Sequence, residues 1–245
     1  MHSGYYAAFT GLLARTDALD VLANNLANLS TTGYKAQHEF YRCLVAASGN
    51  RTLSPLNRAI NNFGVLGGAT VDLRPGTLER TGNPFDVAME GSGFLCVQTQ
   101  AGVRYTRNGN LHAGTDGRLL TANGDTVLGE QGPIEVSGEP VDISTDGTIS
   151  VRGAVLARLR VVDFAPGTQL MPEGNAYYSA PAGADQPAAD PRVRQGNLES
   201  SNLNPVVGAV SLIALQRHAG LLEKALEVLH SDFNRAVVED VPRVS

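Results

Sequence analysis

Two long stretches, one near each end of the chain, repeat apolar residues at alternating spacings of three and four. With this spacing an α-helix presents one apolar face to a partner helix in a coiled coil. The pattern predicts helices over residues 3–29 and 205–234 that pair through these faces. The N-terminal seam consists of Tyr5, Phe9, Leu12, Thr16, Leu19, Ala23 and Leu26. The C-terminal seam consists of Leu212, Leu215, Ala219, Leu222, Leu226, Leu229 and Phe233.

Residues at the helix ends support these boundaries. Asn204 can cap the second helix, and Pro205 suits a first turn because its missing N–H would have no partner there. Gly33 follows the first helix and can adopt the left-handed conformation that often ends a helix.

Each predicted helix carries a second heptad-spaced row beside its seam. A surface helix normally has one apolar stripe and is polar elsewhere, yet the first 33 residues contain only three charged side chains. We therefore expect both helices to pack against other protein subunits as well as against each other. The second rows are Ala7, Gly11, Ala14, Ala18, Val21 and Asn25 in the first helix, and Ser211, Ala214, His218, Leu221, Ala225 and Val228 in the second.

Between the helices, residues 85–198 alternate short apolar stretches with glycine turns, which predicts a β-rich domain of hairpins with a Greek-key-like arrangement. Asp116-Gly117, Asn123-Gly124 and Asp146-Gly147 are expected at hairpin tips as type I′ turns. The expected class is α+β, divided into residues 1–35, an extended connector over 36–84, the β-rich domain over 85–198, and 199–245. Strands are expected over 94–97, 119–120, 126–128, 148–151 and 156–162, and a loop over 181–191.

Composition narrows the class of protein. The 245 residues carry a net charge of −5, which argues against nucleic acid as the main partner. No uninterrupted apolar run approaches the roughly 18 residues that a membrane span needs. Cys43 and Cys96 are too few for a disulfide-rich domain or a multi-cysteine zinc site. The first residues lack the basic start and apolar stretch of a cleavable signal, so we expect a cytoplasmic protein or export that leaves the N-terminus uncut.

Signatures of catalysis and metal binding are weak. Glu90-Gly91-Ser92-Gly93 lacks both glycines of a nucleophile elbow and is expected to be a glycine-rich turn. Asp116 and Asp146 each precede a glycine and are interpreted as turn residues. None of the five histidines has a second ligand at metal spacing. The sequence therefore predicts no catalytic residue, no metal site and no cofactor.

Several strings point instead to a family. Residues 23–35, Ala-Asn-Asn-Leu-Ala-Asn-Leu-Ser-Thr-Thr-Gly-Tyr-Lys, resemble the N-terminal signature of the bacterial flagellar rod and hook family. That signature is a helix ending in Ala-Asn-Asn-Leu-Ala-Asn, followed by Thr-x-Gly-Phe/Tyr-Lys. Further strings resemble the family in the same order along nearly the whole chain: residues 81–88, 91–94, 105–109, 116–121 and 195–206.

The resemblance implies a structural protein of the flagellar basal body. Such proteins assemble helically with copies of themselves and with other rod proteins into the drive shaft that crosses the periplasm. They pass unfolded through the flagellar type III export apparatus with an uncut N-terminus. The end helices would form an inner tube, and the β domain would face outward. No nucleic acid or small molecule is implied as a partner. The residues expected to carry subunit packing are Tyr5, Phe9, Leu12, Leu19, Asn24, Asn25, Leu26, Asn28, Gly33, Leu212, Leu215, Leu222, Leu226, Leu229 and Phe233.

Three alternatives remain at this stage. Residues 81–88, the short length and residues 146–150 resemble the family's proximal rod component. Leu215-Gln216-Arg217 resembles the distal rod component, although His218 follows where that component usually continues Ala-Tyr-Glu. A protein of another class, a soluble hydrolase or carbohydrate-binding β domain whose end helices dimerise, would show a pocket with converging carboxylates instead.

Overall fold

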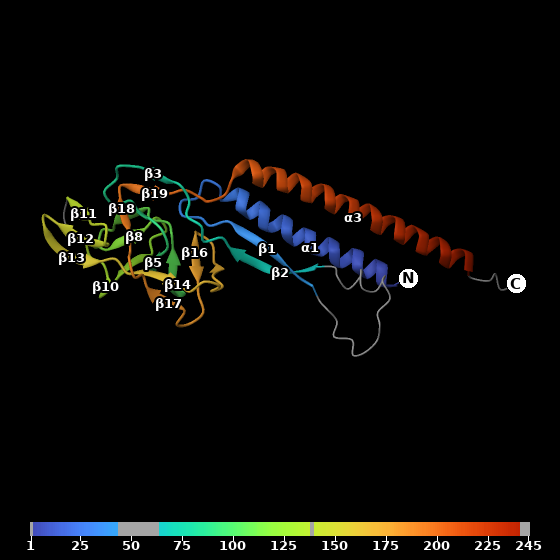
Figure 1. The fold of residues 1–245 in the computed structure, drawn as a ribbon, viewed down its shortest axis with the longest axis horizontal. Helices are drawn as coiled ribbons and strands as arrows, with labels where there is room; N and C mark the ends of the chain where they lie inside the picture. Colours follow the sequence, from blue (N-terminus) through green and yellow to red (C-terminus); the bar gives the residue numbers. More distant parts are fainter. Residues whose placement is uncertain (1, 44–63, 138–139, 241–245) are drawn as a thin grey trace. The chain divides into compact units, whose positions relative to one another are not determined.

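The computed structural model describes residues 2–43, 64–137 and 140–240, and its contacts divide the chain into two compact units (Figure 1). Unit 1 comprises Met1–Leu26, His38–Ala69 and Asn204–Ser245, and unit 2 comprises Ala27–Gln37 and Thr70–Leu203. This division differs from the sequence-based one. Residues 36–84, expected to be an extended connector, contribute strands to both units because partner strands satisfy their backbone groups.

Unit 1 contains the two long helices, which run in opposite directions in Figure 1, and a two-stranded sheet. Asn204 caps the second helix as expected, because its Oδ1 accepts the backbone N–H of Val206 at 3.0 Å and of Val207 at 3.2 Å. The elements are α1 (His2–Ala27), α3 (Pro205–Asp240), β1 (Gln37–Cys43) and β2 (Gly64–Val71). An α+β class is therefore confirmed, with helices at both ends of a mainly β chain.

The buried face of α1 is its second row and not its seam. Among the described side chains of this helix, the buried ones are Ala14, Ala18 and Asn25, all from that row. Phe9, in the N-terminal seam, is exposed. Small side chains let a neighbouring element approach the helix backbone closely, so the row of small residues forms the tighter contact surface. Leu12, Leu19 and Leu26 of the N-terminal seam are partly buried, and the pairing of the two seams stays a prediction.

Helix α3 combines a partly buried seam with an exposed apolar row. Among the described large side chains of this helix, Leu215 is buried, and Leu212, Leu222 and Leu226 are partly buried. Large apolar side chains on the remaining surface are exposed, namely Val206, Val207, Val210, Ile213, Leu221 and Val228. We call these six residues the outward row. Exposed apolar surface of this extent marks an interaction surface.

The outward row changes one expectation about membranes. The 24-residue segment Pro205–Val228 contains an 18-residue window with a mean hydropathy of 1.3, which by length and composition alone is enough to cross a bilayer. The absence of a long uninterrupted apolar run had suggested that no segment meets this criterion. That expectation is wrong for α3, because isolated charges such as Arg217 interrupt the run without lowering its average hydropathy enough. A helix whose apolar surface packs on other protein passes the same test.

Unit 2 is built around a ten-stranded sheet whose main path runs β15-β16-β6-β5-β9-β8-β7. Three further strands branch from it: β10 pairs with β9, β14 with β5, and β17 with β14, and all the pairs of this sheet are antiparallel. The strands are β5 (Phe94–Thr99), β6 (Gly102–Thr106), β7 (Leu111–Ala113), β8 (Leu119–Thr121), β9 (Thr126–Gly129), β10 (Gly132–Pro133), β14 (Val161–Phe164), β15 (Met171–Pro172), β16 (Tyr177–Ser179) and β17 (Asp185–Pro187).

Three small sheets complete unit 2. They are β11 (Val141–Ile143), β12 (Thr148–Val151) and β13 (Ala154–Arg158) in one, β4 (Val87–Met89) and β18 (Val193–Gln195) in another, and β3 (Leu78–Arg80) and β19 (Asn197–Glu199) in the third. The strands expected near residues 94, 119, 126 and 148 are confirmed. The single strand expected over 156–162 is two strands, because the chain leaves β13 at Leu159 to bridge Gly129 before β14 begins. The loop expected over 181–191 contains β17.

Three hairpin turns lie where the dipeptides Asp116-Gly117, Asn123-Gly124 and Asp146-Gly147 predicted them, but their turn type is not the expected one. Gly117, Gly124 and Gly147 have positive φ, whereas the preceding aspartates and asparagine do not, so these are not type I′ turns. Each glycine N–H donates to the carbonyl three residues earlier, at 2.8–3.0 Å. Asp116 and Asp146 accept the N–H two residues later with their side chains, which stabilises a non-primed turn.

The sheet of unit 2 has apolar cores on both faces. Along β5, Leu95 and Val97 belong to one core cluster, while Phe94 and Cys96 belong to the other. Successive side chains of a strand point to opposite faces, so a strand buried on both faces is a continuous apolar run. Burial raises the pKa of the Cys96 thiol to about 12. Cys96 is thus a core residue with little thiolate character.

Candidate functional site

Residues Ala27–Gln37, the junction segment, leave α1 and pack into unit 2. Gly33 has a φ of 68°, and a Cβ at this position would lie 2.2 Å from the backbone carbon of Arg107. Its N–H donates to the carbonyl oxygen of Glu199 at 2.7 Å. The positive φ is as predicted, but α1 ends at Ala27, so Gly33 does not end the helix. It is instead the point where the junction segment touches the backbone of the sheet unit.

The centre of this region is a buried cluster of three charges, Lys35, Arg107 and Glu199, hereafter the charged clamp. Lys35 Nζ lies 2.6 Å from Glu199 Oε1, and Arg107 Nη1 lies 3.3 Å from Glu199 Oε2. The three side chains are at most 1% exposed. One carboxylate thus serves two cations. Removing one partner from such a buried pair is strongly destabilising, because it leaves an uncompensated charge.

Neutral groups satisfy most of the remaining polar atoms of the clamp. Lys35 Nζ also donates to the carbonyl of Arg74 at 2.8 Å, and the N–H of Gly76 donates to Glu199 Oε1 at 2.7 Å. Arg107 Nη2 donates to the carbonyl of Gly91 at 2.8 Å, while its Nε has no hydrogen-bond partner among the described residues. Burial lowers the pKa of the Lys35 ammonium, and the nearby Glu199 carboxylate opposes that effect.

Aromatic side chains cover the clamp. The guanidinium of Arg107 lies 4.9 Å above the centre of the Phe94 ring, a distance at which the ring face attracts a cation. The hydroxyl of Tyr178 accepts the backbone N–H of Lys35 at 2.9 Å. Burial raises the pKa of that Tyr178 hydroxyl, so the group remains neutral and can accept this bond at any physiological pH.

Asn202 extends the clamp to the start of the C-terminal helix. Its Oδ1 accepts the N–H of Ala36 at 2.8 Å, and its Nδ2 donates to the carbonyls of Asp72 and Arg74 at 2.9 and 3.0 Å. The N–H of Asp72 in turn donates to the carbonyl of Ala36 at 2.8 Å. The chain passes between the two units next to these residues, after Gln37, before Thr70 and after Leu203, and it also crosses after Leu26 at the other end of the junction segment. The clamp and Asn202 therefore join the three stretches of unit 2 from which the chain continues into unit 1.

Sequence reasoning found the strings that contain these residues but not their partnership. Lys35, Arg107 and Glu199 each lie in a string that resembles the flagellar family, yet none was assigned a role. The available signal was that Lys35, Arg107 and Glu199 are each the single charged residue of their string. Partners 164 and 92 residues apart cannot be paired from one sequence.

The predicted packing residues that the structure describes differ in burial. Asn25 is buried and Asn24 exposed, while Asn28 accepts the hydroxyl of Thr31 at 3.1 Å through its Oδ1. Leu12, Leu19, Leu26, Leu212, Leu222 and Leu226 are partly buried, and Leu215 is buried. The side chains of Tyr5, Leu229 and Phe233 lie outside the described residues. Their role in subunit packing stays a prediction.

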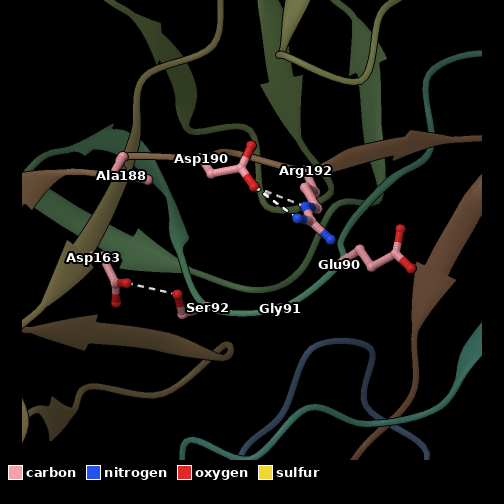
Figure 2. Close-up of a pocket in the computed structure, with 8 residues that line it drawn as sticks. Glu90, Gly91, Ser92, Asp163, Ala188, Asp190 and Arg192 are labelled. Carbon is pink, nitrogen blue, oxygen red and sulfur yellow. Dashed lines mark hydrogen bonds and ion pairs between the residues drawn. The ribbon is translucent and has the colours of Figure 1, made fainter.

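A polar pocket of about 330 Å³ lies beside the clamp in unit 2 (Figure 2). Ser92 Oγ donates to Asp163 Oδ2 at 2.6 Å, and Arg192 pairs with Asp190 at 2.9 Å. The residues that line the pocket include no histidine that could activate Ser92 as a nucleophile. Two of the charged side chains of the lining, Arg192 and Asp190, are paired with each other. The glycines around Ser92 have positive φ and form the turn expected before β5. The pocket lacks the features of a nucleophilic site.

Comparisons with known proteins identify relatives along the whole chain. The family model of the flagella basal body rod protein matches residues 6–35, and that of the flagellar hook protein FlgE/F/G D1 domain matches residues 88–151. The chain is 35% identical to the flagellar basal-body rod protein FlgF of Salmonella typhimurium, over 94% of this chain and 96% of that one. It is 29% identical to FlgF of Caulobacter vibrioides over all of both chains. It is 31% identical to the flagellar basal-body rod protein FlgG of Agrobacterium fabrum, over 86% of this chain and 88% of that one.

We predict that Gly33→Ala weakens the docking of the junction segment on unit 2 by up to several kcal/mol, because both a left-handed φ and a backbone clash oppose the new methyl group. Gly124→Ala is the matched control: its φ is also positive, at 85°, but no atom lies within 4 Å of a Cβ there. That variant should cost only about 1 kcal/mol. Urea unfolding followed by tyrosine fluorescence measures both. Equal losses for the two variants would show that Gly33 does not mark a close approach.

Proposed function

The chain belongs to the family of flagellar basal-body rod proteins and is a structural component of the rod, and we propose that it is the proximal rod component. The match to Salmonella FlgF, the proximal component, exceeds that to Agrobacterium FlgG in both identity and coverage. Residues 81–88 and 146–150 support the same assignment. A label attached to this chain in purified basal bodies should lie at the cell-proximal part of the rod. A label at the hook-side end would assign the distal position instead.

The two long helices are the elements that join subunits in this proposal. The outward row of α3 and the exposed Phe9 and Leu13 of α1 are apolar surface that a lone chain leaves in water. Packing the helices of successive copies, and of other rod proteins, would bury that surface. The helices then form an inner tube through a coiled-coil-like contact, and unit 2 faces outward. Asn24, Asn25 and Asn28 lie on the same stretch and supply polar contacts within it.

A drive shaft must also resist shear inside each subunit, and the charged clamp meets this need. Residues that lead to both long helices are tied to one sheet unit through Glu199, Asn202 and Gly33. The buried ion pairs and hydrogen bonds of the clamp thus hold together, within unit 2, the segments through which torque from the helices enters this unit.

The proposal extends to the location and the partners of the protein. It places the chain in the periplasmic part of the basal body, after transit through the flagellar type III export apparatus without cleavage of a signal peptide. Its partners are copies of itself and other rod proteins. The alternative of a hydrolase or carbohydrate-binding domain with dimerising helices has no support in the relatives found.

The outward row provides the sharpest test of assembly. Leu221 is 63% exposed, so Leu221→Asp should leave the isolated chain folded. In the rod the same carboxylate would be buried without a partner, at a cost of several kcal/mol in every subunit. We therefore expect normal secretion of the variant, loss of assembled rods in electron micrographs and loss of swimming.

Gln169→Asp is the control for added charge, because Gln169 is exposed in the loop between β14 and β15. It should support swimming like the wild-type chain. Leu222→Asp, in the partly buried C-terminal seam, should abolish assembly as well and also reduce the helix content of the purified chain. Normal rods built from Leu221→Asp subunits would contradict a subunit interface on the outward row.

A further inference from the structure

The charged clamp combines residues that lie far apart in the sequence. It contains two cations, Lys35 and Arg107, but only one carboxylate, that of Glu199. Lys35 and Arg107 both precede Glu199, which lies 164 residues after one and 92 after the other. Lys35 Nζ has one other described partner, the neutral carbonyl of Arg74. Arg107 has the neutral carbonyl of Gly91. Glu199 is therefore the carboxylate on which the buried position of both cations depends.

Without that carboxylate, the buried position of Lys35 becomes untenable. A carbonyl oxygen does not neutralise an ammonium, and an unpaired buried charge costs several kcal/mol. Arg107 would repel Lys35 across the vacated carboxylate position, and the Nε of Arg107 already has no hydrogen-bond partner within the described part of the chain. The change with the lowest free-energy cost is exposure of the Lys35 ammonium to water, which requires the junction segment to leave unit 2.

The cores of unit 2 do not require the junction segment. Neither apolar cluster of the sheet contains a residue from Ala27–Gln37. The segment buries the side chains of Tyr34 and Ala36, and hydrogen bonds hold its backbone: Gly33 N–H to Glu199, Lys35 N–H to Tyr178, and Ala36 N–H to Asn202. It can therefore separate while the sheets stay folded, as a unit of lower local stability.

We propose that Glu199 is a latch: the junction segment docks on unit 2 only after β19 has paired with β3 and delivered the Glu199 carboxylate. The N-terminal and C-terminal connections are then fixed in one step, once nearly the whole chain is in place. Loss of the Glu199 charge releases the junction segment without unfolding the sheets. This conformational device concerns the single chain and does not depend on assembly into a rod.

Hydrogen exchange of the full-length Glu199→Gln variant tests the latch. Glutamine keeps an acceptor for the Gly76 N–H and removes only the charge and one hydrogen-bonding oxygen. The amides of Gly33, Lys35 and Ala36 should exchange on the order of 100-fold faster than in the wild type. The core amides of Leu119 and Ile134, which donate within the sheet unit, should keep wild-type rates.

Two further variants separate charge from general damage. Glu79→Gln makes the same change on β3, the strand that pairs with β19, where the Glu79 side chain is exposed and accepts the Ser200 hydroxyl. It should leave exchange of the junction segment unchanged. Lys35→Met in the Glu199→Gln background removes the uncompensated cation that the junction segment carries and should restore most of the protection of Gly33 and Ala36.

Three results would overturn the latch. One is wild-type exchange of the junction segment in Glu199→Gln, and another is equal acceleration in the junction segment and the sheet core. The third is no restoration by Lys35→Met. If Glu199→Gln does not fold, amide hydrogen exchange of the wild-type chain at low denaturant concentration tests the latch instead. The junction amides must then open in a separate, lower-energy step than the core, and opening together with the core rejects the proposal.

Discussion

The Glu199 carboxylate is shared by two buried cations, and the connection between the chain ends and the sheet unit depends on it. Its oxygens face Lys35 and Arg107 at 2.6 and 3.3 Å, in a region where none of the three side chains reaches water. Burying charges is expensive, and their mutual attraction offsets the cost only when geometry and hydrogen bonding are nearly complete. The arrangement therefore adds little to stability compared with an apolar core. It fixes instead which segments meet, because another docking of the junction segment would leave a cation without its counter-ion.

The two units differ in how completely they bury their apolar side chains. Unit 2 buries its apolar side chains on both faces of one sheet, as β5 shows, and needs no partner to complete its cores. Unit 1 buries mainly small residues of α1 and leaves large apolar residues of α3 exposed, with Leu221 as an example. A self-sufficient sheet unit and an unsatisfied helical unit suit a subunit that is stable alone and becomes rigid on assembly. The charged clamp holds together, within unit 2, the segments from which the chain continues into unit 1.

Local signals in the sequence predicted the elements well, and non-local contacts account for what was missed. The start of α3 was predictable because Asn204 and Pro205 act on their own neighbours. The positive φ of Gly33 was predictable too, but its purpose was not, because a helix end and a close approach to Arg107 demand the same conformation. Strand β17 lies in a polar stretch that only its pairing with β14 makes extended. The charged clamp could not be predicted, because a single sequence does not show which lysine pairs with which glutamate.

A reconstruction of the basal body at side-chain resolution tests the central claim most directly. The account predicts continuous density between Lys35 and Glu199 in every copy of this subunit. It also predicts that the outward row of α3, from Val206 to Val228, is covered by helices of neighbouring subunits. Copies in which the Lys35 and Glu199 side chains are separated and solvated, or in which the outward row faces open solvent, would contradict the account.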